Sequence, residues 1–202
     1  MRRAFAMFGL LALVQVSIRA GEGTGGDAIV YPDRLGKEIT DWGYDIKQPN
    51  KAEGLTPEYA KTLFVTDRMT FLRVAIYGNA ADPAHPAPGV IVESRYAPQL
   101  AAMENARKAR PDVLFFANKK IGGKKPFPDW VAGADGVVAA QYARMLADYL
   151  QFMKDRGFDI HILGITCEPE NTGWVNFTAR THKETVDALR ALAADPKFSF
   201  VM

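Results

Sequence analysis

The stretch Ile160-His161-Ile162-Leu163-Gly164-Ile165-Thr166-Cys167-Glu168-Pro169-Glu170-Asn171 decides how this chain folds. Its first half is a near-continuous apolar run, which is typical of a parallel strand buried on both faces. Pro169 cannot donate a ladder hydrogen bond, so the strand should end near Glu168. Glu168 would then lie at the carboxyl end of a buried parallel strand, where α/β barrels keep their active sites. A loop carboxylate that forms an ion pair or caps a helix would fit the same position.

Similar strand patterns repeat along the chain. They begin near residues 39, 70, 112, 160 and 198, and each interval holds a helix pattern. Repeated βα units of this size predict a parallel α/β fold. A doubly wound sheet would fit the same pattern, although no strand is followed by the Gly-x-Gly-x-x-Gly motif of dinucleotide-binding proteins. A (β/α)₈ TIM barrel needs eight such units, usually in about 250 residues. This chain holds four βα units and a fifth strand pattern, so we expect the first four units of a barrel and the start of strand five.

Capping signals mark the expected helices. Thr56-Pro57 is a helix start, with an N-cap hydroxyl and a proline at the first helical position. A second helix is expected from Tyr96 to Arg110, before a proline. The longest should cover Asp135 to Arg156, with Gly157 as its C-cap. Thr181-His182-Lys183-Glu184 has the pattern of a capping box that opens a further helix.

The residues after the central strand resemble a known family. Glu168-Pro169-Glu170-Asn171, behind a long helix that ends Lys154-Asp155-Arg156-Gly157, is similar to the fourth strand of clan A glycoside hydrolases, and closest to glycoside hydrolase family 30. The resemblance implies a secreted retaining enzyme in which Glu168 is the acid/base. It places the nucleophile, a glutamate, after the seventh strand and therefore outside this chain. The family usually has Asn where this chain has Cys167; that Asn bonds the sugar 2-hydroxyl, for which a thiol is a poor substitute.

The resemblance also names residues that would bind the substrate. Arg73 matches an arginine of the second strand that holds the nucleophile ionised, although a structural ion pair would equally satisfy a charge inside an apolar run. Trp130 matches a stacking platform after the third strand, with a core tryptophan as the alternative. Trp174 should overhang the site from the loop after the fourth strand. Tyr77 and Asn118, at the ends of the second and third strands, are expected to contact the sugar as well.

The loop after the third strand is rich in lysine. Lys119, Lys120, Lys124 and Lys125 lie within a few residues of one another. Such a run is usually a solvated loop. On the catalytic face it could also attract an acidic sugar.

Composition and the first residues bear on where the protein acts. The chain has 202 residues, 48% hydrophobic and 24% charged, which is ordinary for a soluble globular protein. Residues 1–20 have the basic start, short apolar run and small final residue of a secretory signal peptide. Without them the chain has 22 basic and 23 acidic residues, so nothing indicates nucleic acid. We expect a flexible N-terminal entry at 21–37, a half-barrel at 38–202, a secreted or periplasmic location, and no stable membrane association after cleavage.

Cysteine and histidine are scarce. Cys167 is the only cysteine, so an intrachain disulfide is excluded. A nucleophilic thiol would need a histidine partner, and His161 should lie at the opposite end of the same strand. His85, His161 and His182 form no metal motif of recognisable spacing. No metal and no cofactor are therefore expected.

These features together predict a glycosidase that acts on a polysaccharide or oligosaccharide. Retaining enzymes need two carboxyl groups about 5 to 5.5 Å apart, and only the acid/base is present, so the chain by itself should be inactive. A non-catalytic carbohydrate-binding barrel-like protein is the alternative. A structural parallel-sheet protein, with Trp130 and Trp174 in its core, is a further one.

Overall fold

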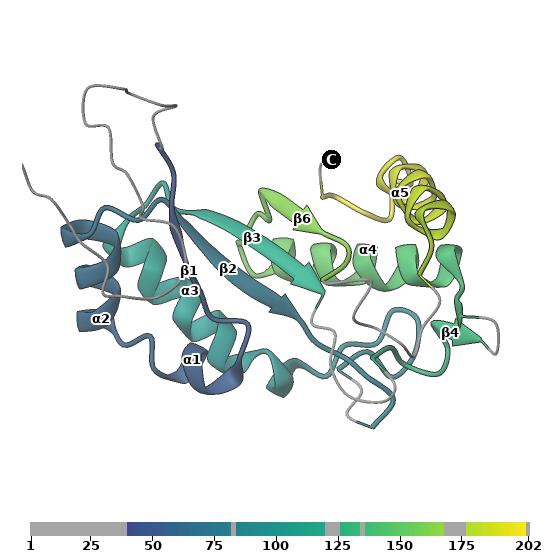
Figure 1. Ribbon diagram of the computed structural model, residues 1–202, viewed down its shortest axis with the longest axis horizontal. Coiled ribbons are helices and arrows are strands. Elements are labelled where there is room, and N and C mark those ends of the chain that lie inside the picture. Colours follow the sequence, from purple (N-terminus) through teal and green to yellow (C-terminus); the bar gives the residue numbers. More distant parts are fainter. Residues whose placement is uncertain (1–39, 82–83, 120–125, 134–135, 168–176, 201–202) are drawn as a thin grey trace, which may run out of the picture. The chain divides into compact units, whose positions relative to one another are not determined.

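A four-stranded parallel sheet forms the centre of the structure. Its strands are β1 (Gly43–Asp45), β2 (Phe71–Ile76), β3 (Leu114–Lys119) and β6 (Ile162–Gly164). They lie in the spatial order β1-β2-β3-β6, and each neighbouring pair is parallel. Figure 1 shows β2 and β3 side by side at the middle of the molecule. The expected parallel α/β fold is therefore confirmed.

The structure is a computed structural model that describes residues 40–81, 84–119, 126–133, 136–167 and 177–200. These residues belong to one compact unit that begins at Thr40. The expected signal peptide (1–20) and N-terminal entry (21–37) lie outside the described residues. Glu168 and Trp174 lie outside them too.

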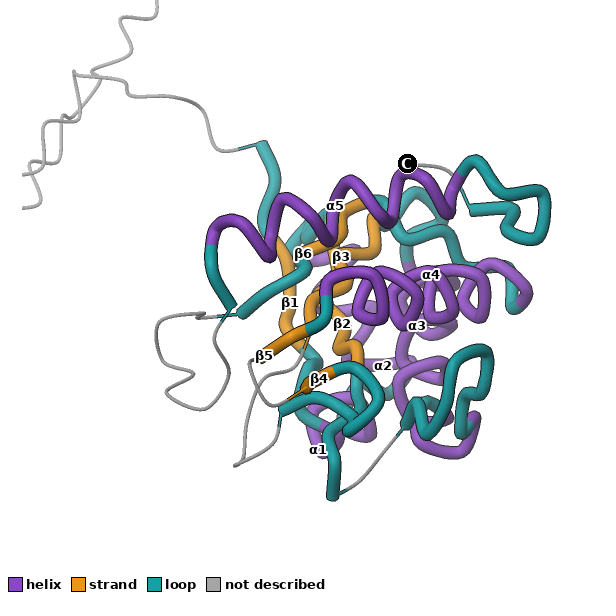
Figure 2. The backbone as a smooth tube through the Cα atoms, turned by 90° about the vertical axis from the view of Figure 1, so that its right-hand side faces the viewer, coloured by secondary structure: helices purple, strands orange, loops and turns teal. Residues whose placement is uncertain are grey.

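Helices pack on one face of this sheet, and Figure 2 shows α2, α3 and α4 together on one side of the strands. A short antiparallel pair, β4 (Ala132–Gly133) and β5 (Gly136–Val137), precedes the longest helix. The helical elements are α1 (Pro49–Glu53), α2 (Pro57–Lys61), the π-helix η1 (Thr62–Thr66), the 3₁₀ turn η2 (Glu93–Arg95), α3 (Ala97–Ala109), α4 (Ala139–Asp155) and α5 (Ala179–Ala193).

The two faces of the sheet differ in burial because strand side chains alternate. In β2, Leu72, Val74 and Ile76 are fully buried against the helices. The alternate residues Phe71 and Arg73 are only partly buried, and β3 repeats the pattern. The hydrophobic core therefore lies between the sheet and the helices, and the opposite face of the sheet remains partly open.

Two of the expected caps are confirmed. The Thr56 hydroxyl accepts a hydrogen bond from the Tyr59 amide at 3.2 Å, and Pro57 is the first residue of α2. After α4, Gly157 has a φ of +77°, which glycine adopts without strain. Its amide bonds the Lys154 carbonyl, and the Phe158 amide bonds the Met153 carbonyl. This is a Schellman motif, and it turns the chain directly into β6.

Four expected boundaries are wrong. The central strand was expected to be buried on both faces and to end near Glu168, but β6 ends at Gly164 and Ile162 is 47% exposed. The helix expected from residue 135 begins at Ala139, because the β4–β5 pair comes first and the Val138 amide bonds the Val131 carbonyl. In α5 the N-cap is Thr178, whose hydroxyl accepts from the Thr181 amide, so the expected capping box lies inside the first turn. Residues 198–200 form no strand, since the Ser199 amide bonds the Gln151 side chain of α4 instead. The start of a fifth strand is thus not found among the described residues.

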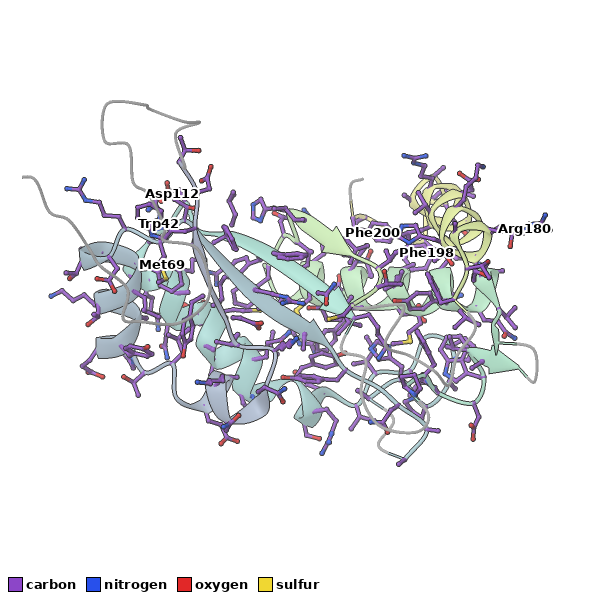
Figure 3. All side chains as sticks on the ribbon, in the orientation of Figure 1. Trp42, Met69, Asp112, Arg180, Phe198 and Phe200 are labelled. Atoms are coloured by element: carbon purple, nitrogen blue, oxygen red, sulfur yellow. The ribbon has the colours of Figure 1, made fainter. Side chains whose placement is uncertain are left out.

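Side-chain contacts hold the segments at the amino ends of the strands together. The Trp42 indole donates to the Asp67 carbonyl at 3.0 Å. Arg110 pairs with Asp112 and donates to the Met69 carbonyl, both at 3.1 Å. Figure 3 shows Trp42, Met69 and Asp112 gathered at this end. These contacts stabilise the fold, whereas functional groups in parallel α/β barrels lie at the carboxyl ends.

Candidate active site

Polar side chains from consecutive strands meet at the carboxyl edge of the sheet. Asp45 is the last residue of β1 and pairs in register with Arg73 of β2. Asn118 of β3 pairs in register with Gly164 of β6, and Cys167 follows β6 closely. Because register-paired residues of parallel strands point to the same face, these groups share the open face of the sheet.

Arg73 is the centre of this cluster. Its Nη1 donates to Asp45 Oδ2 at 3.1 Å, and its Nη2 donates to Asn118 Oδ1 at 2.8 Å. The guanidinium carbon lies 5.5 Å from the Phe116 ring centroid, within cation–π range. The Nε atom is buried and has no hydrogen-bond partner in the described part of the chain. Two neighbouring strands thus fix the plane of the guanidinium, as its planar fork allows.

Asn118 joins the cluster to β6. Only 4% of this residue is exposed. Its Nδ2 donates to the carbonyls of Gly164 and Thr166, at 3.1 and 2.9 Å. A Cβ atom on Gly164 would lie 2.4 Å from that nitrogen, so the close approach requires glycine. Asn118 therefore sets the position of the chain just before Cys167.

Cys167 lies between two cations. Its Sγ is 3.6 Å from Arg73 Nη2 and 3.9 Å from Lys47 Nζ. The Lys47 amide in turn donates to Asp45 Oδ1 at 2.8 Å. A carboxylate, a guanidinium, an ammonium and a thiol thus line one partly open edge. Such a set can accept hydrogen bonds from hydroxyl groups and donate them to hydroxyl oxygens.

No family model and no curated protein sequence matches this chain. Solved structures do match it. The fold of this chain is shared with part of each of the two structures that follow. One neighbour is the endo-β1,6-glucanase BT3312, with a TM-score of 0.60 and 14% identity over 84% of this chain and 45% of that one. Another is SrfJ from Salmonella typhimurium, with a TM-score of 0.59 and 15% identity over 81% of this chain and 42% of that one. The chain therefore spans less than half the length of either neighbour.

A second cluster lies beyond the end of β2. The Tyr96 hydroxyl accepts from the Tyr77 amide at 3.0 Å and contacts His85 Nε2 at 2.9 Å. The Trp130 indole donates to the His85 carbonyl at 2.8 Å. Burial, reinforced by the charge of Lys119, lowers the pKa of His85 to about 3. Burial raises the pKa of Tyr77 to about 12. Both side chains therefore stay neutral near pH 7. The hydrogen bonds of the cluster hold together the segments that carry Tyr77, His85 and Trp130.

Lys119 was expected to lie in a solvated loop, and this expectation is wrong. It is the last residue of β3 and fully buried. Its Nζ donates to the carbonyls of Gly78 and Pro126, both at 2.9 Å, and lies 5.1 Å from the Phe127 ring centroid. Burial of a lysine requires such partners. Lys119 ties the ends of β2 and β3 to the following loop and does not attract an acidic sugar; the other three lysines lie outside the described residues.

The predicted site residues separate into three groups. Arg73, Asn118 and Cys167 come together in the strand-end cluster. Tyr77 and Trp130 belong to the second cluster, where Trp130 is partly buried against the core. Glu168 and Trp174 lie outside the described residues, so their expected roles are untested.

Sequence reasoning missed Asp45 and Lys47. A signal for Asp45 was present, because a buried arginine on one strand needs a carboxylate from a neighbouring strand. Asp45 ends the neighbouring strand β1. Lys47 gave no such signal, since a lysine just after a strand is usually solvated.

Two further properties of the described residues concern metal ions and membranes. No group of three or more His, Cys, Asp and Glu side chains there could hold a metal ion. Among the same residues, no helix has both the length and the apolar composition for a membrane span.

Proposed function

We propose that this chain is the N-terminal half (38–202) of the barrel of a retaining glycoside hydrolase of clan A, related to family 30. The observation that carries the proposal is the cluster of Asp45, Arg73, Asn118 and Cys167 at the carboxyl ends of consecutive parallel strands. It lies where barrel enzymes place their active sites, in a fold shared with an endo-β1,6-glucanase.

In this proposal Glu168 protonates the leaving oxygen and later activates water, and a nucleophilic glutamate comes from outside the chain. Glu168 directly follows Cys167, whose position is fixed by the bonds of Asn118 to the carbonyls of Gly164 and Thr166. Arg73 offers the cation that would keep the nucleophile ionised, and Trp130 and Trp174 would line the sugar site. The substrate class is a β-linked glucan or a related polysaccharide, met outside the cell after cleavage of residues 1–20.

The acid/base role is tested by Glu168→Gln in the enzyme that carries both carboxyl groups. The amide keeps the size of the side chain but cannot transfer a proton. Substrates with poor leaving groups should lose several orders of magnitude in the first step, on the order of general acid catalysis. Activated aryl glycosides should lose much less and accumulate the glycosyl-enzyme, and azide should rescue the second step because a small anion needs no general base. Equal loss on both substrate types, or this signature in Glu170→Gln, would contradict the assignment.

Binding can be tested on the chain itself. Calorimetry with β-linked gluco-oligosaccharides should show binding, and Arg73→Lys should weaken it because lysine lacks the planar fork that Asp45 and Asn118 hold. Arg107→Lys is the matched control, since Arg107 lies on α3 and bonds Glu104 and the Gly157 carbonyl. Equal effects of the two substitutions, or no binding by the unsubstituted chain, would contradict a sugar-binding role for the cluster around Arg73.

A non-catalytic carbohydrate-binding protein is the second candidate. It is favoured by Cys167, which replaces the family's Asn, and by the bonds of both Arg73 terminal nitrogens to Asp45, Asn118 and Cys167. Such a protein would bind the oligosaccharides with no turnover of activated aryl glycosides, even when the missing half is supplied. Cys167→Asn should then strengthen binding without creating activity.

A further inference from the structure

Tyr96 lies at the centre of the second cluster, and aromatic neighbours fix its ring. It is the N-cap residue of α3 and is fully buried. Its ring centroid lies 5.6 Å from that of Tyr149 and 5.3 Å from that of Phe152, which are both residues of α4. Tilted contacts at such distances are a favoured arrangement of aromatic pairs. The helices therefore hold the hydroxyl of Tyr96 at a set position beyond the end of β2.

The hydroxyl of Tyr96 joins two segments of the chain. It accepts a hydrogen bond from the Tyr77 amide at 3.0 Å and lies 2.9 Å from His85 Nε2. His85 Nδ1 is buried and has no hydrogen-bond partner among the described residues. If the imidazole proton were on Nε2, the proton of the Tyr96 hydroxyl would need a further acceptor, and Nδ1 would still be unpaired. Fewer buried groups are unpaired when Tyr96 donates to Nε2, so this is the arrangement that we assign.

His85 connects Tyr96 to Trp130 through its own backbone. The Trp130 indole donates to the His85 carbonyl at 2.8 Å. The preceding residue, Ala84, is fully buried, and its carbonyl accepts from the Val92 amide at 2.9 Å. The segment is thus held by its backbone on one side and by the imidazole on the other. Trp130 itself is only partly buried, so part of it is accessible to a ligand.

We propose that Tyr96 and His85 are positioning residues for Trp130. The Tyr96 hydroxyl fixes the imidazole of His85, and the His85 carbonyl fixes the indole, so that Trp130 can stack on the apolar face of a pyranose ring. An aromatic side chain that is held through its polar atom and partly open on its apolar surface suits such a ligand. The sugar as ligand rests on the proposed function, whereas the chain of hydrogen bonds can be tested without any ligand.

The indole N–H signal of Trp130 in a nitrogen–proton correlation spectrum reports its position. The signal is identified by its loss in Trp130→Phe. Tyr96→Phe and His85→Leu should both shift it, and the double variant should shift it no further, because both substitutions break the same bond. Tyr149→Phe is the matched control and should leave the signal in place. Tyr149 is also fully buried beside Tyr96, but its hydroxyl accepts from Gln99 Nε2 at 3.2 Å.

Calorimetry of the same variants with β-linked gluco-oligosaccharides tests the consequence for binding. Tyr96→Phe should bind about threefold to tenfold more weakly, which corresponds to the loss of one ordinary hydrogen bond. Tyr149→Phe should bind as the unsubstituted chain does. His85→Gln should keep both the indole signal and the affinity, because its amide reaches the place of Nε2 and can accept from the Tyr96 hydroxyl.

Three results would overturn the proposal: an indole signal that does not move in Tyr96→Phe, an equal shift in Tyr149→Phe, or a shift in Tyr96→Phe with unchanged affinity. A failure of the proposed function has a different signature. In that case the unsubstituted chain would bind no oligosaccharide, while an indole shift confined to Tyr96→Phe and His85→Leu would still support the positioning of Trp130.

Discussion

Asn118 offers the sharpest test of how the cluster is held together. Replacement by alanine removes three hydrogen bonds, one from the Arg73 guanidinium and two to backbone carbonyls of the β6 segment. A bond to a charged group contributes about 1.5 to 3 kcal/mol and a neutral one about 1 kcal/mol. Because the site is partly open to water, which can replace some partners, we expect Asn118→Ala to lower the free energy of unfolding by roughly 3 kcal/mol.

Asn105→Ala is the matched control. Asn105 is an asparagine of the same fold that makes one bond, from its Nδ2 to the Leu55 carbonyl at 2.9 Å. Its loss should cost only about 1 kcal/mol. Both variants are compared with the unsubstituted protein by urea denaturation at one fixed protein concentration, because association would shift apparent stability. The midpoint should fall while the slope stays constant.

The expected difference is specific to the carboxyl edge of the sheet. β6 is three residues long, so Asn118 is a large part of what fixes it. Native-state hydrogen exchange should therefore show faster exchange at Ile162–Gly164 in Asn118→Ala and no change there in Asn105→Ala. Equal costs for the two variants, or unchanged exchange in β6, would refute the view that Asn118 positions the segment before Glu168.

Two further predictions concern groups that contact the same elements. Gly164→Ala would place a Cβ 2.4 Å from Asn118 Nδ2, so it should lower the free energy of unfolding about as much as Asn118→Ala. The double variant should lower it by clearly less than the sum of the two, because the clash needs both side chains. Additive losses in urea denaturation would contradict this. The pKa of His85 falls from 6.5 to about 3 on folding, so the unfolded state binds more protons between those values, and the free energy of unfolding should fall with decreasing pH by up to about 1.4 kcal/mol per unit. His85→Gln should remove that part of the slope between pH 6.5 and 5; an unchanged slope would show that His85 is not its source.

Local signals in the sequence were sufficient for most of the fold. Continuous apolar runs located β2 and β3 because both strands lie against the helical core. Thr56-Pro57 and Gly157 located helix ends because their chemistry acts within a few residues. The errors arose where a distant partner decided the outcome. Ser199 is held by Gln151 of α4, 48 residues away, and that contact leaves no trace in the local pattern.

Contacts between residues distant in sequence also limited the prediction of the strand-end cluster. The contact of Asn118 with a sugar stays a prediction, whereas its three observed bonds, to Arg73 and to two carbonyls of the β6 segment, were not expected. A strand-end asparagine gives the same sequence signal whether it contacts ligand or backbone. The close approach of Gly164 to the Asn118 side chain is a contact between two strands, which the local sequence pattern does not reveal.

Of the two interpretations of Arg73 that its sequence allowed, the structural ion pair is observed, and the role toward a nucleophile stays a prediction. Its ion pair with Asp45 is structural, since a cation between apolar residues of β2 needs a carboxylate. The same pair leaves 24% of the arginine side chain and 41% of the aspartate side chain exposed on the open face. An ion pair buried only for stability would gain little from that exposure, because water weakens the attraction between the charges. The exposed part of the pair can present a fixed guanidinium to a further group at the carboxyl edge of the sheet, as the proposed nucleophilic carboxylate would require.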